Sequence, residues 1–419
     1  MQPEYIEYLS GKDIMFQLSN LKQLTFEATD ACNLQCMYCG YGEFYEEYDN
    51  REDNYFPVDK ALLLIDYLTE LWNSPQNISS KRNLTISFYG GEPLLNMPFI
   101  KTIIDYILNK DCRNRTFSFS MTTNALLLHK YMDYLVDKNF KLLISLDGNE
   151  GHTSYRVDKK GNSSYSRIIR GVDLLREKYP VFFDANVNFN AVLHNRNNVQ
   201  EVYNYFKEKY NKTPRIAELS TSGIKAEMKD KFIKTYRNSY ESLRQAENYE
   251  EIEREMYLDS GSFKSAVFYL LHYSGYVYSD YNDLLYDKCS DIKLPTGTCI
   301  PFSKRMFVTV NGKILPCERI GHQYSLGQIT VNTIELNPDK IAHMFNHHLS
   351  KIAKQCNKCF NACACVQCIY HLRNLESRPV CYGFMNEIDF KKYEENQLKF
   401  LEKNPDAYYH IMKDMVVEL

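Results

Sequence analysis

The distribution of the thirteen cysteines constrains this chain more than any other feature of its sequence. Three of them lie together as Cys32, Cys36 and Cys39, and nine fall between Cys289 and Cys381. The long stretch between these two groups holds a single cysteine. Cysteines that cluster in this way in a reducing compartment indicate metal binding or catalysis rather than disulfides. The sequence therefore predicts metal centres in two regions of the chain.

Composition and charge limit the class of protein. The 419 residues are 44% hydrophobic and 25% charged, as in a soluble globular protein of two or three domains. No segment approaches the roughly 20 consecutive apolar residues of a membrane span, and the first residues lack the order of a signal peptide. The net charge of -3 supplies no basic excess for binding phosphates. We expect a cytoplasmic protein without a membrane or nucleic-acid partner.

Strand-like and helix-like segments alternate between about residues 22 and 220. Segments with the apolar periodicity of helices start near Val58, Pro98 and Ser166, and they separate short runs typical of strands. Repeated alternation predicts a parallel sheet, with the reactive loops after the carboxyl ends of its strands. We therefore expect an α/β protein with a partial (β/α)6 TIM-like barrel. The six expected strands are 24–28, 84–89, 116–122, 142–146, 186–192 and 216–219.

Four regions are expected along the chain. The barrel should occupy residues 1–224, and a polar, tyrosine-rich helical bridging region should occupy residues 225–288. Residues 289–385 have cysteines and turns in place of periodicity, so metal binding should stabilise a small irregular domain there. A charged helical tail is expected at residues 386–419.

The motif CNLQCMYC, at residues 32–39, follows the first expected strand directly. Its spacing places three thiolates around one small volume. Three sulfurs are one fewer than an iron-sulfur cube or a structural zinc ion takes. A cluster held by three cysteines keeps one iron open for a further ligand, whereas a zinc site would need a distant fourth residue. This motif by itself leaves both readings open.

A second motif, YGGEPLLN, ends the second expected strand. Gly90 and Gly91 let backbone approach a ligand closely, Glu92 can accept hydrogen bonds from an ammonium group, and Pro93 cannot extend a ladder. Together the two motifs resemble the signature of radical S-adenosylmethionine (SAM) enzymes. The resemblance implies that the open iron chelates SAM and that the turn from Gly90 to Pro93 holds its methionine amino group.

The same resemblance implies roles for further residues. Tyr38 would lie against the adenine of SAM. Ser145 and Arg156 would hold the SAM carboxylate or the loop around it, and Asn188 of the fifth strand would face the ribose. The alternative for the sequence SLDG, which begins at Ser145, is a plain turn without a role in binding.

The second group of cysteines resembles the SPASM extension of radical SAM enzymes. Its pattern is a cysteine, the segment GKILPC, a cysteine-dense knuckle and a last cysteine. The resemblance implies two auxiliary 4Fe-4S clusters, and so three clusters in the whole chain. One auxiliary cluster would be bound by Cys356, Cys359, Cys365 and Cys381, and the other by Cys299, Cys317 and Cys368, with Cys289 as the candidate eighth ligand.

Several points stay open for these cysteines. Without Cys289, the second auxiliary cluster would keep an open iron. Cys363 could replace Cys365, although the position of Cys365 relative to Cys359 fits the family better. The knuckle would also suit a zinc site of four cysteines. Cys112, on a polar loop, is expected to be an incidental thiol.

Among radical SAM enzymes, the chain most resembles maturases of ribosomally made peptides of the ranthipeptide or sactipeptide type, and more distantly anaerobic sulfatase maturases. The resemblance implies an oxidoreductase that forms a 5′-deoxyadenosyl radical and installs a thioether or carbon-carbon crosslink in a precursor peptide. One alternative is the oxidation of Cys or Ser to formylglycine. An iron-sulfur electron carrier or scaffold without SAM chemistry is another.

Glu318 is the candidate catalytic residue, because it follows Cys317 where sulfatase maturases have an acid that takes the substrate proton. It could equally pair with Lys304 or Arg319. The expected partners are a precursor peptide and a reductant such as flavodoxin or ferredoxin. Cys32 comes too early to leave room for the leader-binding domain of many peptide maturases. Leader recognition would then need a separate protein, the bridging region or the tail.

Overall fold

The computed structural model describes residues 7–78, 82–112, 115–256, 261–274 and 294–415. The chain divides into two compact units. The barrel unit consists of Gly11–Glu247 and Ile300–Ile341. The cysteine-rich unit consists of Met1–Ser10, Asn248–Cys299 and Ala342–Leu419. Each unit is described by itself below.

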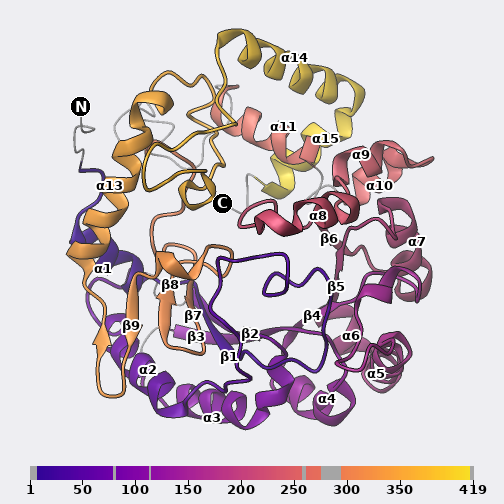
Figure 1. The fold of residues 1–419 in the computed structure, drawn as a ribbon, viewed down its shortest axis with the longest axis vertical. Helices are drawn as coiled ribbons and strands as arrows, with labels where there is room; N and C mark the ends of the chain where they lie inside the picture. Colours follow the sequence, from indigo (N-terminus) through magenta and orange to yellow (C-terminus); the bar gives the residue numbers. More distant parts are fainter. Residues whose placement is uncertain (1–6, 79–81, 113–114, 257–260, 275–293, 416–419) are drawn as a thin grey trace. The chain divides into compact units, whose positions relative to one another are not determined.

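The barrel unit is built on a sheet with strand order β10-β9-β8-β7-β1-β2-β3-β4-β5-β6. Strands β1 to β6 run parallel, and the short strand β7 also pairs parallel with β1. The helices that follow the strands lie outside the row of strands (Figure 1). The parallel strands are β1 (Gln23–Thr29), β2 (Arg82–Gly90), β3 (Arg115–Thr123), β4 (Lys141–Ser145), β5 (Val187–Val192) and β6 (Arg215–Ala217).

The expected fold class is confirmed, and each of the six expected strands is present. The helices of the barrel unit form because their apolar residues recur at helical spacing. In α2, for example, Ala61, Leu64, Ile65, Leu68 and Trp72 are all buried on one face. The helices are α1 (Gly11–Ser19), α2 (Val58–Trp72), α3 (Met97–Leu108), α4 (Leu128–Asp137), α5 (Tyr165–Lys178), α6 (Pro180–Asn186), α7 (Val199–Tyr210), α8 (Lys229–Thr235) and α9 (Ser239–Arg244).

Four short strands extend this sheet beyond β1. They are β7 (Met306–Val308), β8 (Lys313–Leu315), β9 (Gly327–Ile329) and β10 (Ile334–Glu335). The last three pair antiparallel with their neighbours. Strands of two or three residues are too short to show an alternating pattern, so the sequence did not predict them. Their tight turns place the segment around Cys317 in the barrel unit.

The cysteine-rich unit combines helices with irregular loops. Phe263, Ala266 and Leu270 of α11 pack with Ala407 of α15 in one apolar cluster. The 19-residue helix α13 leads to the cysteine knuckle. The apolar residues of α13 recur at helical spacing in the sequence, but this helix was not predicted. The helices are α10 (Tyr249–Glu255), α11 (Gly261–His272), α13 (Pro338–Cys356), α14 (Glu387–Lys403) and α15 (Pro405–His410).

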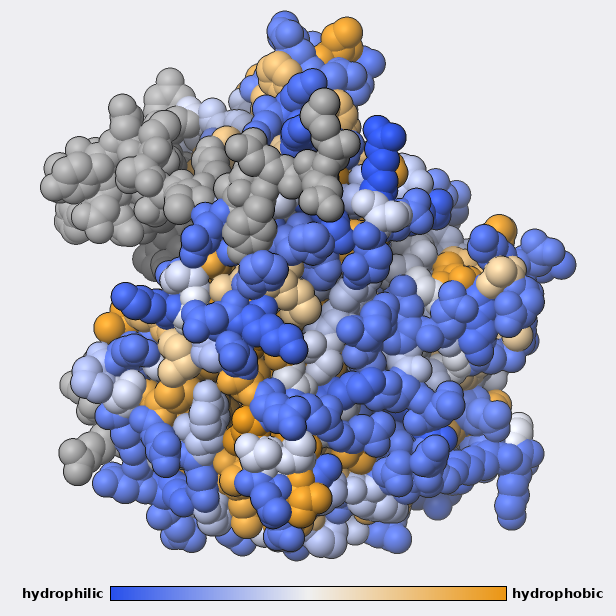
Figure 2. Space-filling view, turned by 60° about the vertical axis from the view of Figure 1, so that its left-hand side comes forward, coloured by the Kyte–Doolittle hydropathy of each residue, from blue (hydrophilic) through white to orange (hydrophobic). Residues whose placement is uncertain are grey.

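The surface in Figure 2 is mainly hydrophilic, with hydrophobic side chains in small, interrupted groups. Within the described residues, none of the helices combines the length and the apolar character that crossing a membrane requires. The four expected region boundaries remain predictions, and residues 275–293, which contain Cys289 and the boundary before it, lie outside the described residues.

Candidate cofactor site and cysteine sites

The loop after β1 brings Cys32, Cys36 and Cys39 together. Burial raises the pKa of Cys32 to about 11 and that of Cys36 to about 12. The negative charge of Cys39 contributes to both raised values, and that of Cys32 contributes to the raised pKa of Cys36, so the three thiols lie close to one another. Three partly buried thiolates at close range are unfavourable without a cation beside them. This donor set therefore suits a metal cluster bound through three cysteines.

The GGEP turn after β2 is joined directly to the base of this loop. The backbone N–H groups of Gly91 and Glu92 donate to the carbonyls of Thr29 and Ala31, at 2.8 and 2.9 Å. A side chain on Gly91 would place its Cβ 2.0 Å from the Ala31 carbonyl oxygen. Gly90 has a φ of +131°, and a Cβ there would lie 2.2 Å from the Thr29 oxygen. Both glycines are required by the close approach of two segments of this chain.

Replacing Gly91 with Ala should therefore separate the turn from the cysteine loop. We expect loss of the SAM-binding cluster, measured as iron per chain and as the visible absorption of protein purified without oxygen. Gly40→Ala is the matched control, because a Cβ at Gly40 meets nothing within 4 Å. A Gly91→Ala protein with the iron content of the wild type would contradict the close packing described here.

Glu92 holds the turn from within. Its carboxylate is fully buried and accepts hydrogen bonds from the Leu94 N–H, the Thr123 hydroxyl and the Asn124 N–H. Burial raises the pKa of Glu92 to about 7, although these hydrogen bonds act to lower it. The Asn124 side chain donates to Asn33 at 2.7 Å and lies 3.8 Å from the Cys32 sulfur. Contact between Glu92 and a bound ligand stays a prediction, and the visible role of this residue is to position the cysteine loop.

Asn124 was not singled out from the sequence. Its only signal there is its place directly after the third strand, at the carboxyl edge of the sheet where ligands gather in parallel α/β folds.

Asp147 is the centre of a second buried network beside the loop. It accepts hydrogen bonds from Nε and Nη2 of Arg156, at 3.0 and 2.9 Å, and from the hydroxyl of Tyr38. Burial acts to raise the pKa of Asp147, but Arg156 and the hydrogen bonds lower it to about 2. The ring of Tyr38 stacks on buried His194 at 5.5 Å between centroids. Arg156 thus binds Asp147 beside Cys36, and its expected role toward SAM stays a prediction.

The sequence analysis treated Asp147 only as a turn residue and missed His194. The position of His194, shortly after β5, was the one available signal. A histidine after a strand is common, however, and its stacking partner Tyr38 is more than 150 positions away in the chain.

Ser145 and Asn188 lie on neighbouring strands but not opposite each other. Ser145 pairs with Asn190 across β4 and β5, whereas Asn188 pairs with Leu143. Asn188 is exposed, and its side-chain oxygen accepts a hydrogen bond from the N–H of Phe189 at 2.8 Å. The structure thus brings Asn190, rather than Asn188, beside the end of β4. The cofactor roles of Ser145, Asn188 and Tyr38 stay predictions.

Cys317 and Glu318 follow β8 in the barrel unit. Arg305 Nη1 donates to both carboxylate oxygens of Glu318, at 2.7 and 2.9 Å. Burial acts to raise the pKa of Glu318, but the charge of Arg305 outweighs it and the pKa is lowered. The ion pair with Arg319 is longer, at 3.8 Å. The main partner of Glu318 is therefore Arg305. The sequence had suggested Lys304 or Arg319 instead.

Two tyrosines lie within electrostatic reach of both Cys39 and Glu318. Burial raises the pKa of Tyr48 to about 12, and the charges of Cys317, Glu318 and Cys39 raise it further. Burial also raises the pKa of Tyr89, again with contributions from Glu318 and Cys39. Cys39 of the first loop and the Cys317–Glu318 segment therefore belong to one region of the barrel unit.

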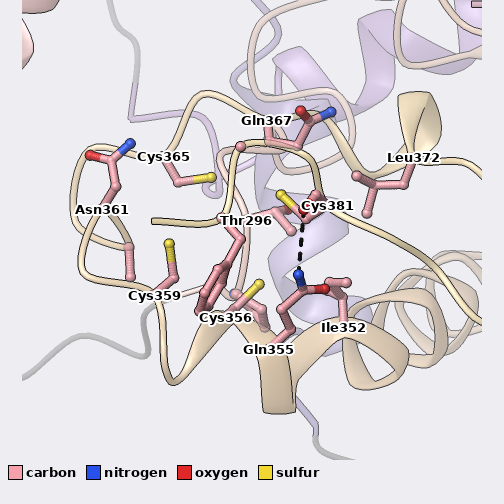
Figure 3. Close-up of a pocket in the computed structure, with 14 residues that line it drawn as sticks. Thr296, Ile352, Gln355, Cys356, Cys359, Asn361, Cys365, Gln367, Leu372 and Cys381 are labelled. Atoms are coloured by element: carbon pink, nitrogen blue, oxygen red, sulfur yellow. Dashed lines mark hydrogen bonds between the residues drawn. The ribbon is translucent and has the colours of Figure 1, made fainter. Parts of the chain in front are cut away.

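Four cysteines of the cysteine-rich unit surround one pocket (Figure 3). The sulfurs of Cys356, Cys359, Cys365 and Cys381 point toward a common space. Burial raises the pKa of Cys356 to about 12, and the charges of the other three thiols raise it further. Four facing thiolates are the donor set of a closed 4Fe-4S cluster. Cys363 is exposed and is not among the residues that line this pocket.

The structure brings together only part of the second auxiliary set expected from the sequence. Burial raises the pKa of Cys368, and the charge of Cys299 contributes, so these two thiols are neighbours. Cys317 belongs to the other unit, and Cys289 lies outside the described residues. Cys112 contacts the hydroxyl of Thr69 at 3.8 Å.

Within the described residues, no three His, Cys, Asp or Glu side chains are gathered tightly enough to hold a single metal ion. The number of thiols at the first loop and at the four-cysteine pocket, together with their partial burial, suits iron-sulfur clusters rather than a single ion.

One family model matches a part of the barrel unit. Residues 26–208 match the model of the Radical SAM superfamily. The expected resemblance to radical SAM enzymes is confirmed.

Individual relatives match parts of the chain. A cysteine-type anaerobic sulfatase-maturating enzyme of Clostridium novyi is 30% identical over 196 residues, which are 46% of this chain and 49% of that protein. The radical SAM cyclopropyl synthase TigE of Paramaledivibacter caminithermalis is 24% identical over 221 residues, 52% of this chain and 43% of that protein. The chain thus spans about half the length of these curated relatives.

A solved structure, native anSMEcpe with bound AdoMet, shares the fold. It has a TM-score of 0.60 and 18% identity, and the match covers 94% of this chain and all of that chain.

Proposed function

We propose that this protein is a radical SAM peptide maturase that installs a thioether or carbon-carbon crosslink in a ribosomally synthesised precursor peptide. The observation that carries the proposal is the joining of the three-cysteine loop to the GGEP turn within a radical SAM domain. The four-cysteine pocket adds a second redox site. Relatives named as sulfatase-maturating enzymes and as a cyclopropyl synthase support a peptide or protein substrate.

Cys32, Cys36 and Cys39 would hold the SAM-binding cluster, and Gly90, Gly91, Glu92 and Pro93 would form the turn beside the bound SAM. A cluster held by these cysteines would supply the electron for the reductive cleavage of SAM and so the radical chemistry at a substrate carbon. The chain itself orients the substrate and excludes quenchers. The auxiliary clusters would be held at the two cysteine sets expected from the sequence, and a flavodoxin or ferredoxin would serve as electron partner.

Co-expression with the precursor peptide encoded nearest to this gene tests the proposal. A crosslink removes about two hydrogens, so the peptide should become about 2 Da lighter, as measured by mass spectrometry. SAM cleavage should be seen separately as 5′-deoxyadenosine formed with dithionite. Absence of 5′-deoxyadenosine would leave only an electron carrier or scaffold. Its presence without a lighter peptide would remove the crosslinking step alone.

The oxidation of Cys or Ser to formylglycine is the second candidate. It is favoured by the similarity to sulfatase-maturating enzymes and by an acidic residue directly after Cys317. A short sulfatase-derived peptide that contains the target Cys or Ser distinguishes the two functions. Formation of an aldehyde, captured with a hydrazine reagent, would favour this second function over crosslinking.

Replacing Glu318 with Gln should lower product formation by roughly 100-fold, because general bases contribute about 10²–10⁴-fold to rate. The lowered pKa of Glu318 keeps it ionised near neutral pH and ready to take the proton that leaves the substrate radical. Formation of 5′-deoxyadenosine should change little, since it precedes that step. The comparison of crosslinked peptide with 5′-deoxyadenosine measures the uncoupling.

Glu335→Gln is the matched control, because Glu335 is an exposed residue of the short strand β10. An unchanged ratio of crosslinked peptide to 5′-deoxyadenosine in the Glu318→Gln enzyme would assign this carboxylate to its ion pair with Arg305 alone.

A further inference from the structure

The surface next to the four-cysteine pocket has exposed hydrophobic side chains directly beside the cysteines. Phe360 follows Cys359, Val366 follows Cys365, and Tyr382 follows Cys381. Val366 is 67% exposed and Tyr382 is 73% exposed. Large apolar side chains at such exposure are individually common, but here each one adjoins a thiol of the same pocket. Three of the four cysteines that line the pocket are therefore followed directly by an exposed hydrophobic or aromatic side chain.

This surface is also strongly basic. Residues 351–386 contain five basic residues and one acidic residue, a formal net charge of +4, whereas the whole chain carries -3. The one acidic residue, Glu376, pairs with Lys351 at 3.6 Å. The other four cations are exposed, and no acidic partner is found for them among the described residues: Lys354, Lys358, Arg373 and Arg378.

One of these cations, Arg373, contacts the exposed aromatic side chain of Tyr382. The Arg373 guanidinium lies 5.3 Å from the centre of the Tyr382 ring, and its Nη1 donates to the Tyr382 hydroxyl at 3.4 Å. The N–H of Val380 donates to the Arg373 carbonyl at 3.3 Å, which holds these segments together on one side of Cys381. Lys354 lies in the last turn of α13 and Lys358 follows this helix, so the two lysines lie on either side of Cys356 in the sequence.

We propose that this surface docks an acidic one-electron carrier protein, of the flavodoxin or ferredoxin type, which exchanges electrons with the cluster held by the four cysteines. We call it the knuckle surface, and it consists of Phe360, Val366, Tyr382, Lys354, Lys358, Arg373 and Arg378. The proposal rests on the proposed function, because it needs a cluster in the pocket. A surface with apolar side chains and several positive charges suits a small interface with an acidic protein, because the opposite charges steer the two proteins together.

The electron balance follows from substrate oxidation. After the hydrogen atom has left, bond closure releases one proton and one electron from the substrate. The cluster accepts that electron, and the oxidised carrier takes it from the cluster and becomes reduced by one electron. No bond to the carrier forms or breaks. The proton passes to a base of the enzyme and then to water.

Charge reversal tests the surface directly. The full-length holoenzyme and its Lys354→Glu/Lys358→Glu variant are titrated with purified oxidised flavodoxin without oxygen, at about 20 mM and about 500 mM salt. We expect the dissociation constant to rise about tenfold or more in the variant at low salt and to converge with the wild type at high salt, where charges are screened over a few ångströms. The rate at which flavodoxin oxidises the reduced enzyme should fall in parallel.

Lys130→Glu/Lys141→Glu is the matched control, because it makes the same change in net charge at exposed positions of the barrel unit. It should bind flavodoxin as the wild type does. Val366→Ser removes apolar surface instead of charge, and it should weaken binding at both salt concentrations. Iron content and reoxidation by neutral benzoquinone should stay unchanged in all variants, which shows that the clusters are intact.

Equal dissociation constants for the wild type and Lys354→Glu/Lys358→Glu would overturn the proposal. So would a variant with a higher KM for the precursor peptide and unchanged flavodoxin binding, because the surface would then bind the substrate. Formation of 5′-deoxyadenosine with dithionite reports the proposed function separately. If it fails in the wild type, the radical SAM chemistry is wrong. If 5′-deoxyadenosine is formed but the charge reversal leaves the dissociation constant for flavodoxin unchanged, only the proposed docking surface is wrong.

Discussion

Replacing Cys32, Cys36 and Cys39 together with Ala should reduce the formation of 5′-deoxyadenosine from SAM to background. These three thiols are the whole protein donor set of the first loop, and no other cysteine follows until Cys112. Without them no iron is left to bind SAM or to deliver an electron to its sulfonium. The measurement is 5′-deoxyadenosine by liquid chromatography after incubation with SAM and dithionite.

The iron content separates this loss from a general collapse. The triple variant should lose about four irons per chain and keep those of the auxiliary sites, since their cysteines lie elsewhere. Cys112→Ala is the control and should cleave SAM at the wild-type rate, because the thiol of Cys112 contacts Thr69 of α2 and this residue does not belong to the first cysteine loop. SAM cleavage that survives in the triple variant would falsify the assignment of this loop.

Replacing Arg156 with Met should lower the free energy of unfolding of the barrel unit by about 3–5 kcal/mol, the usual loss when one partner of a buried ion pair is removed. Asp147 is completely buried and Arg156 nearly so, with side-chain exposures of 0% and 7%. The variant leaves a buried carboxylate without its cation. It also removes the group that draws Asp147 and Tyr38 together next to Cys36, so retention of iron should weaken as well.

Arg167→Met is the matched control, because Arg167 pairs with Asp158 at the surface and its side chain is 48% exposed. Such a pair contributes about 0–1 kcal/mol. The chain has one tryptophan, Trp72, which is buried in α2 of the barrel unit. Its fluorescence during urea denaturation therefore reports the unfolding of this unit. Equal midpoints for the two variants would mean that the Asp147–Arg156 pair does not hold the loop.

The barrel could be predicted because its signal is repeated and local. Each long strand combines β-branched or aromatic residues with a following helix whose apolar residues recur at helical spacing, as in 58–72. The strands β7 to β10 carry no such pattern, since two or three residues do not define a period. They gain order from pairing with the edge of an existing sheet, and that edge is made by β1, almost 300 positions earlier.

Site residues divide in the same way. Gly91 and Glu92 were identified from a motif, but the motif suggested contact with a ligand. The structure shows that Gly91 meets Ala31 and that Glu92 accepts hydrogen bonds from three donors of the chain, and contact of these residues with a ligand stays a prediction. Arg305 could not be chosen over Lys304 or Arg319 as the partner of Glu318, because three cations near one acid in sequence differ only in the direction of their side chains.

The sequence by itself determined the class of chemistry. Cysteine spacing is local, and three or four thiols within a short segment must share a small volume whatever the rest of the chain does. Only the tertiary structure decided how that volume is held. Tyr38, the Asp147–Arg156 pair and His194 come from separate parts of the chain, and burial makes the ion pair and the hydrogen bonds strong enough to position Tyr38. That strength depends on the exclusion of water by the folded barrel, which no spacing of residues encodes.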